Sequence, residues 1–101
     1  MTTTLPLPAQ RSLQNLGVSI SKARRRRAWD QKAFAAMMGV WVSTVKRLES
    51  DNSGVALHTL IRAMLALQLL DDFDLLLEAP NDRPGLIQQD ENLPQRIRKM
   101  A

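Results

Sequence analysis

The stretch that decides the fold is Gln31 to Ser50, which reads QKAFAAMMGVWVSTVKRLES. Asp30, immediately before it, offers a side-chain cap for a helix from Gln31 to Met38. Gly39 stands where that helix must end, because glycine takes the left-handed conformation at a helix C-terminus without strain. A second helix fits Val42 to about Ser50. The segment therefore predicts two short helices joined by a tight turn.

The residues of this segment also match the framework of a helix-turn-helix. Two helices that cross steeply need a small residue on the first, a glycine in the turn, and an apolar plug six residues later. Ala35, Gly39 and Val45 occupy these places, and Leu48 repeats the inward face one turn further on. The remaining inward positions are filled by Phe34, Met38 and Val40. An ordinary helical hairpin is the alternative interpretation.

Apolar residues at helical spacing continue on both sides of the segment. They predict a first helix from Ser12 to about Arg27, a fourth that carries Leu57 and Leu60, and a fifth from about Asp71 to Glu78. The expected fold class is all-α: a compact five-helix domain over residues 12–79. A flexible N-terminal arm (residues 1–11) and a flexible C-terminal tail (residues 80–101) are expected to flank it, because both are rich in proline and lack periodicity.

Length and composition exclude several classes of protein. A chain of 101 residues without cysteine and with one histidine supports one small domain and offers no disulfide or zinc site. We expect no metal, no cofactor and no enzymatic activity, since no nucleophile–base pair or phosphate-binding glycine loop is present. We expect no role at a membrane, because neither a signal peptide nor a stretch of roughly 20 apolar residues occurs. The expected location is cytoplasmic.

Charge is distributed unevenly along the chain. Residues 1–49 hold nine basic and two acidic residues, whereas residues 50–92 hold two basic and eight acidic ones. A basic half followed by an acidic half indicates one face for a polyanion and another for a different contact.

Several features around the two helices carry a resemblance to a known family. The first helix ends in a run of arginines before Trp29, Gln31 opens the second helix, and Arg47-Leu48-Glu49 closes the third. Glycine–valine stands in the turn, and the fourth helix is rich in leucine. With these features, the run from Leu16 to about Leu77 resembles the DNA-binding domains of Cro/cI-type repressors, the XRE family. The resemblance implies a sequence-specific repressor that binds a palindromic operator in double-stranded DNA as a homodimer.

In that family the third helix enters the major groove while the second crosses the DNA backbone. By position, the resemblance assigns base contacts to Val42, Ser43, Lys46 and Arg47. It assigns backbone contacts to Gln31, Thr44, Asn52 and Ser53. A solvated helix face is the alternative for each of these residues. Only one or two of Arg24–Arg27 can face the duplex, because consecutive helical residues point about 100° apart; the others pair with acids such as Glu49 or stay in water.

Trp41 departs from the family, which usually has serine or threonine there to cap the recognition helix. Two roles are open for it: a buried or partner-packing side chain, or a contact with the DNA backbone. The fifth helix offers an apolar side as a dimer interface, with plain core packing as the alternative. Its residues in question are Phe73, Leu76 and Leu77. His58 is expected at the surface or in a cap.

Two stretches narrow the resemblance to antitoxins of the Hip type. They are LESDNSGVALHTL (residues 48–60) and LPQRIRK (residues 93–99). Such antitoxins autoregulate their operon and bind a HipA-like serine/threonine kinase toxin. The tail is then expected to bind the toxin through Leu93, Arg96, Ile97 and Arg98. Extra DNA affinity or a free end are the alternatives for the tail. For the whole protein, the alternatives are a stand-alone or phage-type repressor without a toxin and a helical adaptor that does not bind DNA.

Overall fold

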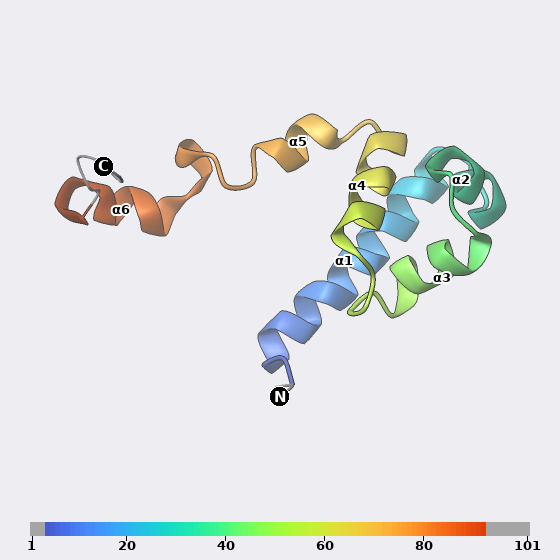
Figure 1. Cartoon of the computed structure of the whole chain (residues 1–101), viewed down its shortest axis with the longest axis horizontal. Helices are drawn as coiled ribbons and strands as arrows, with labels where there is room; N and C mark the ends of the chain where they lie inside the picture. The colour runs from blue at the N-terminus through green and yellow to red at the C-terminus, as the bar shows by residue number, and fades with distance from the viewer. Residues whose placement is uncertain (1–3, 93–101) are drawn as a thin grey trace. The chain divides into compact units, whose positions relative to one another are not determined.

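The computed structural model describes residues 4–92, and throughout this range the only regular structure is helical. The elements are α1 (Leu7–Arg26), α2 (Gln31–Met38), α3 (Val42–Ser50), α4 (Leu57–Ala66), α5 (Leu70–Asp74), the 3-10 helix η1 (Ala79–Asn81) and α6 (Arg83–Asn92) (Figure 1). The all-α prediction is confirmed for these residues. The chain divides into two compact units, Met1–Leu70 and Asp71–Ala101, and each is described by itself.

Helix α1 begins earlier than the sequence predicts. It starts at Leu7 rather than at Ser12, so the expected arm over residues 1–11 is wrong for its last residues. The two prolines do not prevent this, because Pro6 lies at the N-cap and Pro8 in the first turn, where no intrahelical N–H is required. The Gln10 side chain also donates a hydrogen bond to the Leu5 carbonyl at 2.7 Å.

Helices α2 and α3 have the bounds that the sequence predicts. Asp30 caps α2 by accepting a hydrogen bond from the Ala33 amide at 2.7 Å. Gly39 ends α2 in the left-handed conformation, with φ 73° and ψ 35°. Trp41 precedes α3 in an extended conformation and provides no side-chain cap.

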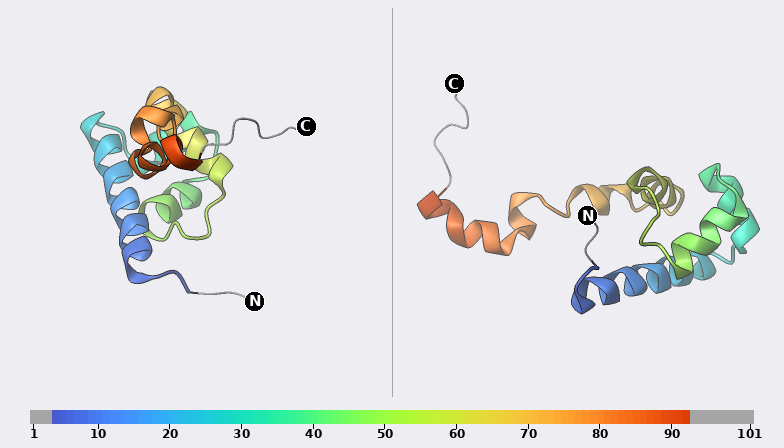
Figure 2. Two further views of the ribbon diagram at one scale, coloured as in Figure 1. Left: turned by 90° about the vertical axis from the view of Figure 1, so that its left-hand side faces the viewer. Right: turned by 60° about the horizontal axis from the view of Figure 1, so that its bottom comes forward.

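The first unit is built around α3, which packs against both α1 and α2, while α2 also packs against α4 (Figure 2). The apolar core lies among these helices. Its buried members are Ile20, Ala23, Phe34, Ala35, Met38, Val45, Leu48, Ala63 and Leu67. Most of them come from α2 and α3, so the two helices that carry the candidate interface are also the best-anchored part of the unit.

The second unit differs from the sequence prediction in two ways. Helix α5 ends at Asp74 instead of Glu78, and tight turns follow, in which the Leu76 amide bonds to the Phe73 carbonyl. Helix α6 forms where no helix was expected. It was missed because its few apolar residues form no stripe, although Asp82 supplies a cap by accepting from the Gly85 amide at 3.1 Å.

Candidate nucleic-acid interface

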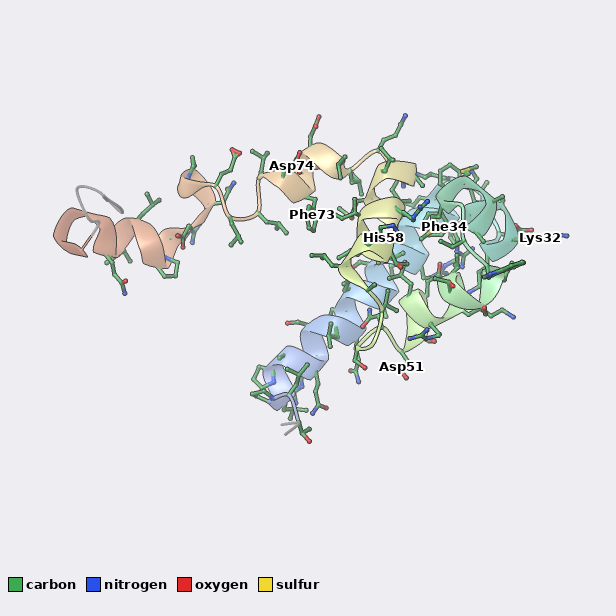
Figure 3. The ribbon with its side chains drawn as sticks, in the orientation of Figure 1. Lys32, Phe34, Asp51, His58, Phe73 and Asp74 are labelled. Carbon is green, nitrogen blue, oxygen red and sulfur yellow. The ribbon has the colours of Figure 1, made fainter. Side chains whose placement is uncertain are left out.

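The turn between α2 and α3 is held by the residues that the sequence singled out. Ala35 is 2% exposed, which lets the two helices approach closely. Val45 and Leu48 of α3 are fully buried, and Gly39 adopts the left-handed conformation between the helices. Phe34 lies on the inward side of α2, whereas Lys32 projects outward from the same helix (Figure 3). The placement of α3 relative to α2 is therefore fixed by packing.

The outward face of α3 is polar and basic. Ser43, Lys46 and Arg47 are exposed, and Val42 is half-buried at the edge of the core. Their spacing of three and four residues places these three polar side chains on one side of the helix, opposite Val45 and Leu48. The face can therefore donate hydrogen bonds and present positive charge to one partner surface.

A buried ion pair ties α1 to the end of α3. The Arg24 guanidinium donates to both carboxylate oxygens of Glu49, with Nε 2.7 Å from Oε2 and Nη2 3.1 Å from Oε1. Its Nη1 donates to the Trp29 carbonyl at 2.8 Å, so the group is satisfied although it is 9% exposed. Hydrogen bonding to Glu49 raises the pKa of Arg24 despite the opposing effect of burial. Arg24 is thus a structural arginine and is not free to reach a phosphate.

The other arginines of the run have different surroundings. Arg27 donates to the carbonyls of Ala23 and Leu67, at 2.7 and 2.8 Å, and its guanidinium lies 5.9 Å from the centre of the Trp29 ring. Arg25 and Arg26 are exposed. The run therefore contributes two exposed positive charges, and how many of them face a duplex stays a prediction.

Gln31, the first of the residues predicted to contact the DNA backbone, lies at the first position of α2. Its amide nitrogen donates to Oε1 of Glu49 at 3.1 Å, so the Arg24–Glu49 pair also orients this side chain. The first amides of a helix have no intrahelical acceptor and favour an anion. Gln31 is half-buried, and Thr44 on α3 is half-buried as well.

In the loop after α3, Asn52 has a structural role that the sequence did not reveal. Its Nδ2 donates to the carbonyls of Leu13 at 2.9 Å and Leu48 at 3.2 Å, which fixes the loop to α1 and α3. The side-chain amide of Asn52 is therefore engaged within the protein, which leaves only its backbone amide for the predicted phosphate contact. Ser53 is exposed, and its hydroxyl lies 3.4 Å from the Asp51 carboxylate.

Two positions that matter for this geometry escaped the sequence analysis. Gly17 is buried where α1 meets α3, and a Cβ there would lie 2.5 Å from the carbonyl oxygen of Glu49. Arg62 of α4 donates from Nη1 to the Met38 carbonyl at 3.0 Å, which satisfies the end of α2 beside the turn. Its Nε donates to the exposed His58 at 3.3 Å. A glycine inside a helical pattern was the one available signal, since it indicates a close backbone approach.

The expected dimer-interface residues all belong to the second unit. Phe73 is half-buried, whereas Leu76 is 61% and Leu77 87% exposed. The two leucines therefore do not pack in a core within this unit, which was the alternative role. Their role in a dimer interface stays a prediction. The predicted partner-binding tail, Leu93, Arg96, Ile97 and Arg98, lies outside the described residues.

Neither a metal site nor a membrane-spanning helix is found in the part of the chain that the structure describes. Among the side chains that the structure describes, no group of three or more histidine, cysteine or acidic residues is placed to hold a metal ion. No helix in the described range has the length and apolar character needed to cross a bilayer.

Comparison of the chain with protein-family models, with curated proteins and with solved structures found no match. The structure itself establishes a small all-helical domain.

Proposed function

We propose that this protein is a sequence-specific DNA-binding repressor of the Cro/cI type, which inserts α3 into the major groove. The observation that carries the proposal is the α2–turn–α3 arrangement. One side of α3 is buried through Val45 and Leu48, and the other presents Ser43, Lys46 and Arg47 to solvent. A rigidly held helix with exposed donors matches what reading of base edges requires.

Charge supports a nucleic acid as the partner. Residues 1–49 have seven more basic than acidic residues, and the Glu49 carboxylate among them is already paired with Arg24. The exposed charges of α2 and α3 are therefore positive: Lys32, Lys46 and Arg47. Such a surface attracts the phosphate backbone. The affinity falls as the salt concentration rises, because binding releases counterions from the DNA and their release into a more concentrated solution gains less entropy.

Within this proposal, the finer function is that of an antitoxin that represses its own operon and binds a HipA-like kinase toxin. Its support is the likeness of residues 48–60 and 93–99 to Hip-type antitoxins. We further propose that two copies bind a palindromic operator, because one α3 reads only a few base pairs and a dimer reads two half-sites. A stand-alone repressor would share the DNA interface and lack the toxin.

The experiment is selection of duplexes by the purified protein from a random-sequence pool, followed by anisotropy titrations at increasing salt. The proposal predicts an enriched, palindromic sequence and an affinity that falls steeply with salt. A helical adaptor would enrich no sequence and would show no marked salt dependence in binding its protein partner. Failure to enrich any sequence would overturn the proposal.

A further inference from the structure

The interface described above leaves Trp41 without a role. This residue lies between the turn and α3, its side chain is 82% exposed, and it makes no capping hydrogen bond. The other tryptophan is accounted for: the Trp29 ring stacks on Phe34 with centroids 6.0 Å apart and packs against the core. Exposure of one apolar residue is common and is not informative by itself. Trp41 differs from the other exposed apolar side chains in two respects: it lies at the start of α3, and its ring combines a large apolar face with an N–H donor that suits a partner surface.

The main chain of Trp41 is held firmly, so its indole projects from a defined place. The Trp41 carbonyl accepts hydrogen bonds from the amides of Thr44 at 2.9 Å and Val45 at 3.4 Å. Since Val45 is fully buried, the start of α3 cannot shift without disturbing the core. The indole thus stands at the end of α3 that carries Val42 and Ser43.

The charges near Trp41 favour a polyanion over an apolar protein surface as the partner. From residue 31 to residue 50 the only acid is Glu49, and its carboxylate is engaged by Arg24. The exposed charges of these two helices are Lys32, Lys46 and Arg47, all positive. An apolar protein partner would have to desolvate or oppose these charges, whereas DNA neutralises them.

We propose that Trp41 contacts the DNA backbone beside the groove that α3 enters. The inference rests on the proposed function and adds a residue to it. The indole has a flat apolar face that packs on a deoxyribose, and its Nε1–H donates a hydrogen bond to a phosphate oxygen. Such a contact carries no sequence information, so it sets affinity and orientation and leaves the choice of bases to α3.

The first test compares Trp41→Ala and Trp41→Phe with the wild type on the duplex selected from the random pool and on an unrelated duplex. We expect Trp41→Ala to lose roughly tenfold in affinity on both duplexes, and Trp41→Phe to lose less because it keeps an aromatic face. Leu65→Ala, at a 62% exposed position of α4, is the matched control and is expected to change neither affinity. A loss confined to the selected duplex would overturn the backbone assignment.

The second test follows the indole itself. Acrylamide quenching of the wild type and of Trp41→Phe is measured with and without the selected duplex, and the difference between the two proteins reports on Trp41. We expect the duplex to protect Trp41 and to leave the half-buried Trp29 unchanged. If the duplex binds and Trp41 stays fully quenchable, the contact is refuted while the DNA-binding function stands. If the pool yields no selected duplex, the proposed function fails, and the inference fails with it.

Discussion

Replacing Gly17 with alanine tests how closely α1 packs on α3. A Cβ at Gly17 would lie 2.5 Å from the carbonyl oxygen of Glu49, 3.0 Å from its carbonyl carbon and 3.3 Å from the Leu48 oxygen. All three are backbone atoms, so the overlap is relieved only if one helix moves. By helix propensity alone, alanine in place of a helical glycine would stabilise the protein by roughly 0.5–1 kcal/mol. The two effects have opposite signs.

The magnitudes decide which effect dominates. Overpacking of a close-packed contact typically costs roughly 1–3 kcal/mol, and more when backbone must shift. After the gain in propensity is subtracted, we expect a net destabilisation of about 1–2 kcal/mol. For a domain of this size each kcal/mol lowers Tm by roughly 4–8 °C, so Tm should fall by about 5–15 °C.

The assay is thermal unfolding followed by circular dichroism, with urea unfolding as a second measurement. Gly54→Ala is the matched control, because its nearest neighbour is the flexible side chain of Arg47 at 3.5 Å, an ordinary contact. We expect the control to leave Tm nearly unchanged. A higher Tm for Gly17→Ala would refute the close approach of α1 and α3 on which the geometry of the interface depends.

Three further predictions concern the turn, assembly and the tail. Gly39→Val should lower stability by roughly 1–3 kcal/mol in urea unfolding, because φ is 73° there; Gly39→Asn should lower it less, and equal stability of both variants would contradict the left-handed turn. Leu77→Asp should convert a dimer to monomers in light scattering without unfolding the chain, since Leu77 is 87% exposed; a monomeric wild type would remove the dimer proposal. Deleting residues 80–101 should weaken binding of a kinase-like toxin and spare DNA binding; a general loss of DNA affinity with a flatter salt slope would make the tail a DNA arm.

The sequence was most informative where one residue decides a local conformation. Asp30 and Gly39 predicted both ends of α2. An aspartate directly before a helical pattern commonly serves as its N-cap, and a glycine directly after the pattern commonly ends the helix in the left-handed conformation. The burial of Val45 and Leu48 followed from helical periodicity. These local signals suffice to define α2, the turn and α3.

Helix bounds were missed where proline or weak periodicity obscured them. Pro6 and Pro8 suggested a loose arm, yet proline is compatible with the first turn of a helix, and α1 begins at Leu7. Helix α6 has almost no apolar stripe, so only its cap at Asp82 signalled it. Periodicity and composition therefore misplaced the start of α1 and did not predict α6.

Contacts between helices were the hardest to foresee. The sequence left open which arginine of the run pairs with Glu49. The structure shows that it is Arg24, and this pairing depends on how α1 crosses α3. The bonds from Asn52 to α1 and from Arg62 to the end of α2 join residues 39 and 24 positions apart. No local pattern encodes such pairs, because they depend on tertiary packing.

The most direct test of the account is the affinity of Arg47→Ala for the selected duplex relative to an unrelated duplex of the same length. Arg47 is exposed on the outward face of α3, so its removal should leave the fold intact. We predict that binding to the selected duplex weakens by about 1–3 kcal/mol, roughly five- to 150-fold, while binding to the unrelated duplex changes little. Equal losses on the two duplexes would contradict the claim that α3 reads bases.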